Sequence, residues 1–235
     1  MERAIILAGG KGTRLYPYTS LIPKPLVPVG DKAILEIVLL QLKENGIRKI
    51  DIAVNHLSHL IMAYFGDGSR MGLEITYHLE DKPLGTVGPL HKIKPKDDFI
   101  VMNGDTLTDI SYLDLLNRHR EKKSLTTIST FNRQQNIDFG VLSVNKESSI
   151  VSFTEKPVYD FEVSMGIYAM NEEIIKYIPQ DKFYGFDDLV IDLIDRNIKP
   201  LSYRHDGLWL DIGLPEDYDI ANNTIEQLNI PVYSE

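Results

Sequence analysis

Three glycines within four residues near the amino terminus give the sequence its clearest chemical signal. Gly9, Gly10 and Gly12 follow a short apolar run, residues 4–8, of the kind that forms a buried parallel strand. Because glycine carries no side chain, such a loop turns tightly and lets backbone N–H groups approach a ligand closely. The sequence therefore predicts an anion-binding loop directly after a strand.

The glycine loop matches neither of the two common phosphate-binding fingerprints. The P-loop needs Ser or Thr after Gly-Lys, where this chain has Gly12, and the dinucleotide pattern needs a third glycine where it has Leu15. Three cations accompany the loop, Lys11, Arg14 and Lys24, the last between two prolines that favour extended backbone. Since the net charge of the chain is -9, these cations form a local concentration of positive charge.

An acidic residue ends another apolar run further along the chain. Residues 98–102 predict a buried strand, and Asn103, Gly104 and Asp105 follow it. Taken alone, Asn-Gly is typical of a hairpin turn. At the carboxyl end of a parallel strand, however, Asp105 would lie beside the anion held by the glycine loop, where a carboxylate is a ligand for Mg²⁺. We therefore expect Asp105 to bind a metal.

The complete N-terminal string resembles the signature of the sugar-1-phosphate nucleotidyltransferases, which make nucleotide sugars. It reads Leu7-Ala8-Gly9-Gly10-Lys11-Gly12-Thr13-Arg14-Leu15 and continues in Pro23-Lys24-Pro25. The similarity covers five motifs in the family's order, from Ile5 to about Tyr218, and is closest to the mannose-1-phosphate and heptose-1-phosphate guanylyltransferases. It implies that an NTP reacts with a sugar 1-phosphate, with Mg²⁺ as cofactor, to give an NDP-sugar and pyrophosphate.

The resemblance also implies roles for residues along the chain. The expected catalytic residues are Arg14, Lys24, Asp105 and Asp211, with one Mg²⁺ shared by the two aspartates. The expected nucleotide-binding residues are Leu7, Ala8, Gly9, Gly10, Lys11, Gly12, Thr13, Glu80, Gly85 and Thr86. The expected sugar-phosphate-binding residues are Asn103, Gly140, Glu155, Lys156, Ser164 and Gly166. Ser164 departs from the family pattern, which often has Asn there, so the sugar stays open among mannose, heptose and glucose.

Glu80 stands five residues before Gly85, in the segment that the resemblance assigns to base recognition. A carboxylate only accepts hydrogen bonds, and guanine presents two adjacent donors, N1–H and the exocyclic amine, that one carboxylate can meet together. Uracil and thymine pair better with an amide. Glu80 therefore predicts GTP as the nucleotide, with UTP or dTTP as the alternative.

Alternating apolar patterns place these residues on strands and helices. Strands are expected at 4–8, 50–54, 72–79, 98–102, 125–131, 139–144, 150–153, 164–170, 201–203 and 208–213. Helices are expected at 33–42, 56–65, from 84–86, at 111–123, at 186–196 and from 215. The order predicts an α/β, Rossmann-like three-layer sandwich with a mixed, mostly parallel sheet and a smaller sugar-facing β portion. We expect a single domain, 1–235, with a nucleotide-binding half to about 125 and a sugar-binding half from about 126.

Composition limits the remaining possibilities. The 235 residues, 43% of them hydrophobic, fit a folded domain and exclude a disordered chain. The absence of cysteine excludes thiolate metal sites and fits a reducing compartment, so we expect the cytoplasm. No apolar run approaches the roughly 20 residues that span a bilayer. The acidic charge argues against nucleic-acid or membrane binding. The partners that the resemblance implies are an NTP and a sugar 1-phosphate, with a homo-oligomer possible.

Two other functions stay open. A glycosyltransferase that uses nucleotide sugars usually relies on Asp-x-Asp at a strand end, whereas Asp217 and Asp219 lie in the last predicted helix. A catalytically silent relative that senses a nucleotide sugar is the other, although every charged catalytic position is filled. His56 and His59 are three apart on a predicted helix but lack a third ligand, so they predict no zinc site.

Overall fold

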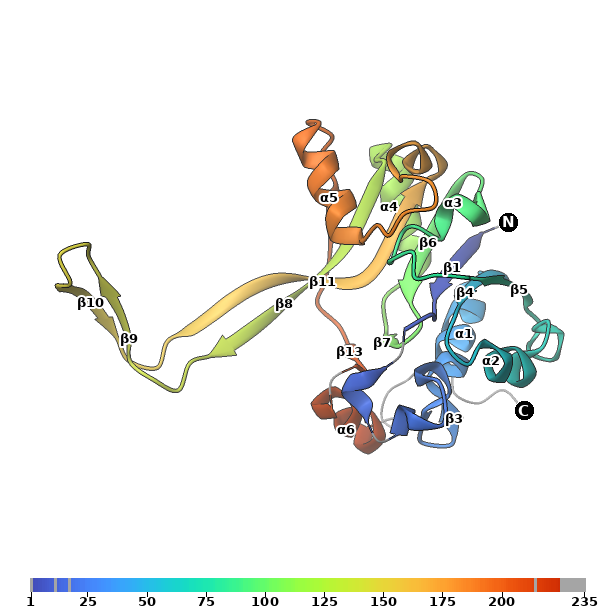
Figure 1. Ribbon diagram of the computed structural model, residues 1–235, viewed down its shortest axis with the longest axis horizontal. Coiled ribbons are helices and arrows are strands. Elements are labelled where there is room, and N and C mark those ends of the chain that lie inside the picture. The colour runs from blue at the N-terminus through green and yellow to red at the C-terminus, as the bar shows by residue number, and fades with distance from the viewer. Residues whose placement is uncertain (1, 11, 17, 214, 225–235) are drawn as a thin grey trace.

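The computed structural model of the chain describes residues 2–10, 12–16, 18–213 and 215–224 (Figure 1). Its centre is a seven-stranded sheet with the strand order β12-β8-β11-β6-β1-β4-β5. Six of these strands run in one direction, and β11 runs antiparallel to its neighbours β6 and β8. The predicted mixed, mostly parallel α/β sheet is therefore confirmed.

The elements have the following bounds. The strands are β1 (Arg3–Leu7), β2 (Pro28–Val29), β3 (Lys32–Ala33), β4 (Lys49–Val54), β5 (Glu74–Leu79), β6 (Asp98–Asn103), β7 (Thr106–Thr108), β8 (Thr126–Asn136), β9 (Val141–Val144), β10 (Ile150–Thr154), β11 (Val158–Asn171), β12 (Leu201–His205) and β13 (Trp209–Asp211). The α-helices are α1 (Ile34–Glu44), α2 (Ser58–Phe65), α3 (Leu90–Ile93), α4 (Tyr112–Lys122), α5 (Phe186–Asp195) and α6 (Pro215–Thr224). Short 3-10 turns include η1 (Thr13–Leu15) and η3 (Lys24–Leu26).

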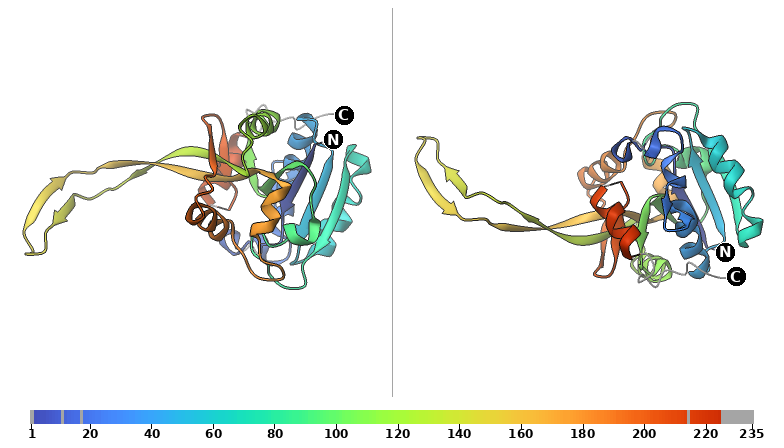
Figure 2. Two further views of the ribbon diagram at one scale, coloured as in Figure 1. Left: turned by 90° about the horizontal axis from the view of Figure 1, so that it is seen from above. Right: turned by 90° about the horizontal axis from the view of Figure 1, so that it is seen from below.

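Helices cover both faces of the central sheet, as the two views in Figure 2 show. Alternation along β1 sends Ala4 and Ile6 to one face and Ile5 to the other. The first face packs against α1, α2 and α4, and the second against α3 and α5. Because its strands are buried on both sides, the middle of the sheet reads as continuous apolar runs rather than as an alternating pattern.

One helix begins later than the sequence predicts. The helix expected from 84–86 starts at Leu90, and residues 85–89 form turns instead. Gly85 has a φ of 78°, which a helix does not accommodate. The other predicted helices form with small shifts at their ends, and none of the helices in the described ranges is long and apolar enough to cross a membrane.

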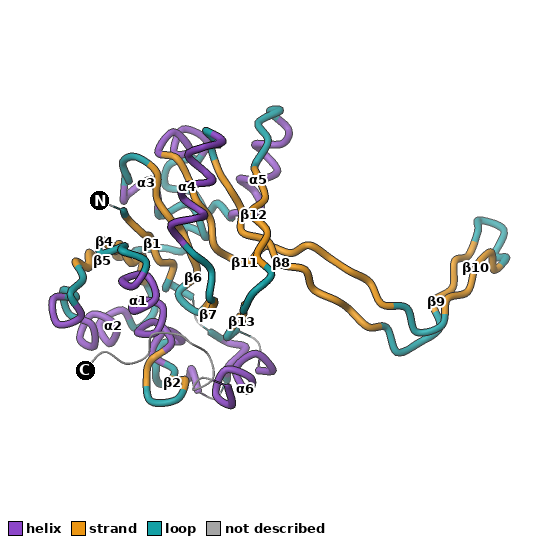
Figure 3. Tube along the Cα trace, turned by 180° about the vertical axis from the view of Figure 1, so that it is seen from behind, coloured by secondary structure: helices purple, strands orange, loops and turns teal. Residues whose placement is uncertain are grey.

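Strands β8 and β11 continue beyond the sheet as a long two-stranded projection (Figures 1 and 3). We call residues 133–162 the arm; the β9–β10 hairpin forms its tip. The pairing of β11 with β8 shifts register between Ser164 and Tyr168, where Gly166 has a φ of 74°. Such a bulge bends the strand that carries it. The sequence predicts only the parts of β8 and β11 that lie in the core, since residues 132–136 are polar and lack a buried face.

Candidate active site

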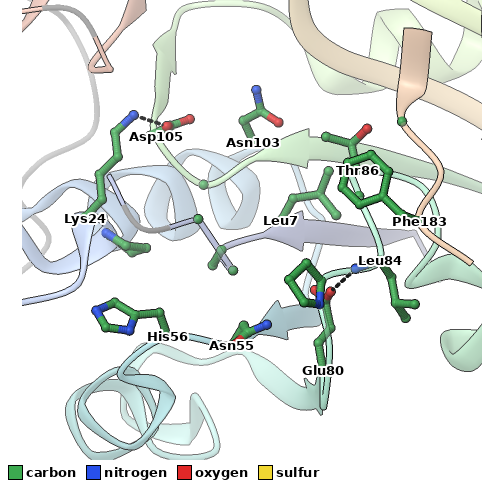
Figure 4. Close-up of a pocket in the computed structure, with 18 of the residues that line it drawn as sticks. Leu7, Lys24, Asn55, His56, Glu80, Leu84, Thr86, Asn103, Asp105 and Phe183 are labelled. Carbon is green, nitrogen blue, oxygen red and sulfur yellow. Dashed lines mark hydrogen bonds and ion pairs between the residues drawn. The ribbon is translucent and has the colours of Figure 1, made fainter. Parts of the chain in front are cut away.

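A cavity of about 840 Å³ opens where the carboxyl ends of β1, β4, β5 and β6 meet (Figure 4). Backbone hydrogen bonds continue past these strand ends and hold the following segments side by side. The Ala8 N–H donates to the Ala53 carbonyl at 2.9 Å, and the Gly104 N–H donates to the Leu7 carbonyl at 3.0 Å. The glycine loop and Asp105, which were expected to share this edge of the sheet, both lie at it.

Four charged side chains converge around Gly213. Lys24 forms an ion pair with Oδ2 of Asp105. A Cβ added to Gly213 would lie 2.8 Å from each of Arg14 Nη2, Asp211 Oδ1 and Lys24 Nζ. These residues line or adjoin a second cavity of about 230 Å³, which shares part of its wall with the larger one. The structure thus brings together all four residues expected to be catalytic.

Lys24 reaches this cluster from a tight turn. The expectation of extended backbone at Lys24 is wrong: Pro23 is extended, with a ψ of 146°, but Lys24 itself opens the 3-10 turn η3. A Cβ added to Gly12 would lie 2.9 Å from Lys24 Cβ, so glycine is required for the loop to pack against the lysine. The Thr19 hydroxyl donates to the Gly12 carbonyl at 2.7 Å and holds the loop there. Lys11 and the side chain of Thr13 lie outside the described residues.

Asp211 is positioned by strand pairing and by a buried acid. In the antiparallel pair of β13 with β7, Asp211 lies opposite Thr106, the residue after Asp105. The Asp217 carboxylate, in the first turn of α6, accepts the backbone N–H of Asp211 at 2.9 Å. Asp217 is also paired with Arg133 at 2.9 Å. The sequence places Asp217 in an Asp-x-Asp pair at the start of the last predicted helix, but its role in positioning Asp211 was missed.

The donor set at this cluster fits a divalent cation. Oδ1 of Asp105 is buried and has no hydrogen-bond partner among the described residues. A buried, unpartnered carboxylate oxygen is costly unless a positive charge compensates it. In the described part of the chain no three or more His, Asp or Glu side chains gather into a metal cage. Two carboxylates completed by substrate oxygens and water are the usual environment of Mg²⁺ at a nucleotide.

Glu80 lies across the cavity from Asp105 (Figure 4). Its Oε2 accepts the Leu84 N–H at 3.1 Å, and its Oε1 would lie 3.3 Å from a Cβ added to Gly9. Burial raises the pKa of Glu80 above its ordinary value, against the smaller opposing effect of the Leu84 N–H. A partly desolvated carboxylate with spare acceptor positions therefore lies beside the glycine loop.

The raised pKa of Glu80 predicts a pH-dependent cost in stability. The folded protein holds the Glu80 proton more tightly than the unfolded chain, whose pKa is near 4.5. The tighter proton binding adds to the free energy of unfolding. This favourable contribution is fully present below pH 4.5 and is lost as the pH rises through the folded pKa, so the ionised Glu80 makes the protein less stable at higher pH. The gain in Tm from Glu80→Gln should accordingly be larger at pH 8 than at pH 4.5, as measured by calorimetry. Glu74→Gln, on the exposed start of β5, is the control, and a gain independent of pH contradicts the expectation.

A segment distant in sequence forms another wall of the cavity. Phe183, Gly185, Asp187 and Asp188 all line it. The Tyr184 N–H donates to the Leu84 carbonyl at 2.9 Å. This wall was missed, because no local pattern in residues 183–188 reveals contacts made across the fold.

The predicted residues Gly85 and Thr86 meet this segment directly. The Phe186 N–H donates to Thr86 Oγ1 at 2.6 Å, so that hydroxyl joins the two loops. A Cβ added to Gly85 would lie 2.4 Å from the Tyr184 carbonyl oxygen, so the close approach requires glycine. Asn55 and His56 also line the cavity. They were missed as ligand contacts, although they follow β4 just as Asp105 follows β6, and this signal could have found them.

Three of the expected sugar-phosphate residues lie together. Asn103 lines the cavity, and a Cβ added to Gly166 would lie 2.6 Å from its Nδ2. The Ser164 hydroxyl lies 3.3 Å from both the Gly166 N–H and the Tyr168 hydroxyl. The bulge in β11 therefore brings Gly166 directly against the cavity wall.

The other three expected sugar-phosphate residues lie on the arm. Gly140 precedes β9, and Glu155 and Lys156 form the turn between β10 and β11. All three are exposed, and none lines either cavity of its own chain. Figure 3 shows this part of the arm well away from the body of the molecule.

The glycine loop lies at the end of a strand on a mixed α/β sheet, and two cations and a carboxylate pair lie close to it. An arrangement of this kind suits the binding of a phosphorylated ligand. Residues 3–228 match the profile of the family described as Nucleotidyl transferase. The chain belongs to this family.

Proteins that are similar to this chain have names that specify different nucleotide bases. The chain is 34% identical to the UTP--glucose-1-phosphate uridylyltransferase of Synechocystis sp., over 97% of this chain and 66% of that protein. It is also 34% identical to the D-glycero-alpha-D-manno-heptose 1-phosphate guanylyltransferase of Campylobacter jejuni, over 92% of this chain and 96% of that protein. The crystal structure of HddC from Yersinia pseudotuberculosis has a TM-score of 0.76 and 26% identity, covering 96% of this chain and 100% of that chain. HddC has also been solved complexed with GMP-PN.

Proposed function

We propose that the chain transfers a nucleotidyl group from an NTP, preferably GTP, to a sugar 1-phosphate, giving an NDP-sugar and pyrophosphate. The observation that carries the proposal is the convergence of Arg14, Lys24, Asp105 and Asp211 beside a cavity lined by the glycine loop. In this reaction two polyanions must meet and one anion must leave. A site that places cations and a carboxylate pair around one point suits that requirement, because it neutralises charge and aligns the reacting groups.

Each part of the cluster has a role in this scheme. Backbone N–H groups of Gly9, Gly10 and Gly12 bind the phosphates of the NTP. Lys24 binds the α-phosphate, and Arg14 neutralises the pyrophosphate as it leaves. The attacking oxygen comes from the sugar phosphate, so no side chain acts as a nucleophile.

Asp105 and Asp211 are the residues that would hold Mg²⁺. The unpartnered Oδ1 of Asp105 and the neighbouring carboxylate of Asp211 supply hard oxygen ligands of the kind that this ion prefers. When bound, Mg²⁺ supplies electrostatic stabilisation of the phosphate oxygens during transfer. Until then, Lys24 compensates the charge on Asp105.

Glu80 is the residue that favours guanine. Its carboxylate lies beside Gly9 and already accepts one backbone N–H, which fixes its orientation and leaves acceptor positions for N1–H and the exocyclic amine of guanine. The heptose 1-phosphate guanylyltransferase among the relatives supports this base, and the uridylyltransferase supports UTP. A panel of GTP, UTP, dTTP, CTP and ATP against mannose, heptose and glucose 1-phosphates, read by pyrophosphate release, decides between them. Absence of pyrophosphate with every pair contradicts the proposal.

Replacing Glu80 by Gln should change the base preference. The amide keeps an acceptor for the Leu84 N–H but presents one acceptor and one donor to the base, a pattern that suits uracil or thymine better than guanine. We expect kcat/KM for GTP to fall by about tenfold to 100-fold, the effect of mismatching one or two hydrogen bonds, and the ratio of UTP to GTP turnover to rise.

The control for this change is Glu74→Gln, on the same strand but at its exposed start. It should leave every kcat/KM unchanged. A Glu80→Gln variant that keeps the wild-type ratio of GTP to UTP turnover would remove Glu80 from base recognition.

A further inference from the structure

The arm exposes apolar surface that its own chain does not cover. Among the described residues, nine large apolar side chains within 23 positions of the arm are at least 42% exposed: Phe139, Leu142, Val144, Ile150, Val151, Phe153, Val158, Tyr159 and Phe161. Monomeric proteins rarely leave such a cluster uncovered, and an isolated two-stranded ribbon is marginally stable in water. We therefore expect the apolar side chains of the arm to pack against another surface.

The tip of the arm presents one continuous apolar face. In the β9–β10 ladder, Val144 lies opposite Ile150 and Leu142 lies opposite Phe153. Side chains of directly opposite residues share a face, so these four side chains lie together. The register shift between Ile150 and Ser152 is what keeps Phe153 on the same face as Ile150.

A continuous ladder of strand pairs runs along the arm and holds it away from its own body. Strands β8 and β11 are paired residue by residue from Val158–Asn136 to Ser164–Thr130. At the root of the arm, Arg133 pairs with Asp217 at 2.9 Å, and its guanidinium lies 4.6 Å from the centroid of the Trp209 ring. These contacts fix the direction in which the arm leaves the sheet, so its apolar face is available to another molecule.

Among the described residues that line the larger cavity, acids outnumber the single lysine, so a second phosphorylated substrate would need a cation from elsewhere. The described carboxylates that line it are those of Glu80, Asp81, Asp105, Asp187 and Asp188. Lys24 is the one lysine or arginine in its described lining, and it is paired with Asp105. The turn at the base of the tip carries Lys156, which is exposed and lines neither cavity of its own chain. The arm thus carries a cation that complements the cavity.

An apolar surface beside the cavity complements the tip of the arm. Phe183 lines the cavity and is 68% exposed, and Ile191 and Ile194, three residues apart on α5, are 59% and 57% exposed. Helix α5 stands on the side of the body from which the arm leaves (Figures 1 and 3). The chain therefore carries both halves of an apolar interface, on parts that do not meet within one molecule.

We propose that two copies of the chain exchange their arms. The apolar face of each tip packs on the Phe183–α5 surface of the other copy and brings Lys156 to that copy's cavity, where its ammonium binds the phosphate of the sugar substrate. A two-fold exchange of identical elements covers both arms and completes both sites at once. The role of Lys156 rests on the proposed function, whereas the dimer does not.

Sedimentation velocity tests the assembly without any use of activity. The wild type is expected to be a dimer at micromolar concentration, and Leu142→Ser/Phe153→Ser should raise its dissociation constant at least about tenfold. The matched control is Met62→Ser/Leu113→Ser, which removes two exposed apolar side chains from α2 and α4 and should leave the dimer intact. A monomeric wild type, or a dimer that the arm variant does not weaken, overturns the proposal.

Complementation tests whether the arm acts on the other copy. Lys156→Ala, which damages the arm, and Asp105→Asn, which damages the cavity, should each lower kcat by about two orders of magnitude. A heterodimer of the two, co-expressed with different tags and purified through both, contains one site with an intact cavity and an intact incoming lysine. It should recover about half of the wild-type activity per dimer.

The outcomes separate this inference from the proposed function. If the heterodimer stays as inactive as its parents while the wild type is active, the exchange of Lys156 between copies is wrong. If the wild type releases no pyrophosphate with any substrate pair, the proposed function fails, and the sedimentation result still decides whether the arms are exchanged.

Discussion

Asp105→Asn should lower kcat for pyrophosphate release by about two orders of magnitude or more, the scale of losing one contact to the transition state. The substitution keeps the shape of the side chain but removes the negative charge that Lys24 and a divalent cation would share. The buried, unpartnered Oδ1 of Asp105 is the atom that would bind the cation, and a neutral amide in its place no longer attracts one. Titration with Mg²⁺ should show that the variant needs a higher concentration for half-maximal rate.

Two measurements separate this effect from loss of the fold. Asp31→Asn, in the exposed turn between β2 and β3, is the matched control and should leave kcat unchanged. Calorimetry should show that Asp105→Asn still unfolds cooperatively, because the backbone of Asp105 keeps its place at the end of β6. A kcat within a few-fold of the wild type would exclude Asp105 from the catalytic cluster.

Arg14→Ala should also lower kcat by about two orders of magnitude. The Arg14 guanidinium lies near the Asp211 carboxylate and the Lys24 ammonium, around Gly213, but its side chain is exposed, so its removal leaves the core intact. The proposed role is to neutralise the leaving pyrophosphate. In the reverse reaction, therefore, the KM for pyrophosphate should rise more than the KM for the NDP-sugar.

The conservative variant sharpens this test. Arg14→Lys keeps the charge but loses the planar two-pronged donor, so it should recover part of the lost rate. Arg70→Ala, in an exposed 3-10 turn far from the cluster in sequence, is the control and should match the wild type. Equal increases in both KM values would contradict a specific role for Arg14 at pyrophosphate.

The parallel sheet explains why part of the site could be predicted. Apolar runs such as residues 4–8 and 98–102 identify buried strands, and the carboxyl ends of parallel strands meet at one edge. The residues that follow the runs, Gly9 and Asp105 among them, must then lie near one another. The same reasoning applies to Glu80 after β5, and it would have applied to Asn55 after β4.

Local sequence patterns could not predict the contacts that residues make across the fold. Phe183 and Asp187 join the cavity because Tyr184 and Phe186 hydrogen-bond to the loop at 84–86, and neither partner shows this in its own sequence. The 3-10 turn at Lys24 is a similar case. Pro23 restricts its own backbone, whereas the conformation of Lys24 follows from packing against Gly12 and pairing with Asp105.

The sequence by itself determined the sheet, the glycine loop and the identity of the charged residues, because strand patterns and glycine conformations are local properties of the chain. The tertiary structure alone decided that Asp211 stands beside Asp105, through the pairing of β13 with β7. It also decided that the Glu155–Lys156 turn projects on an arm. The direction of the arm depends on a bulge at Gly166 and on contacts of Arg133 with residues about 80 positions away, and no local pattern encodes either.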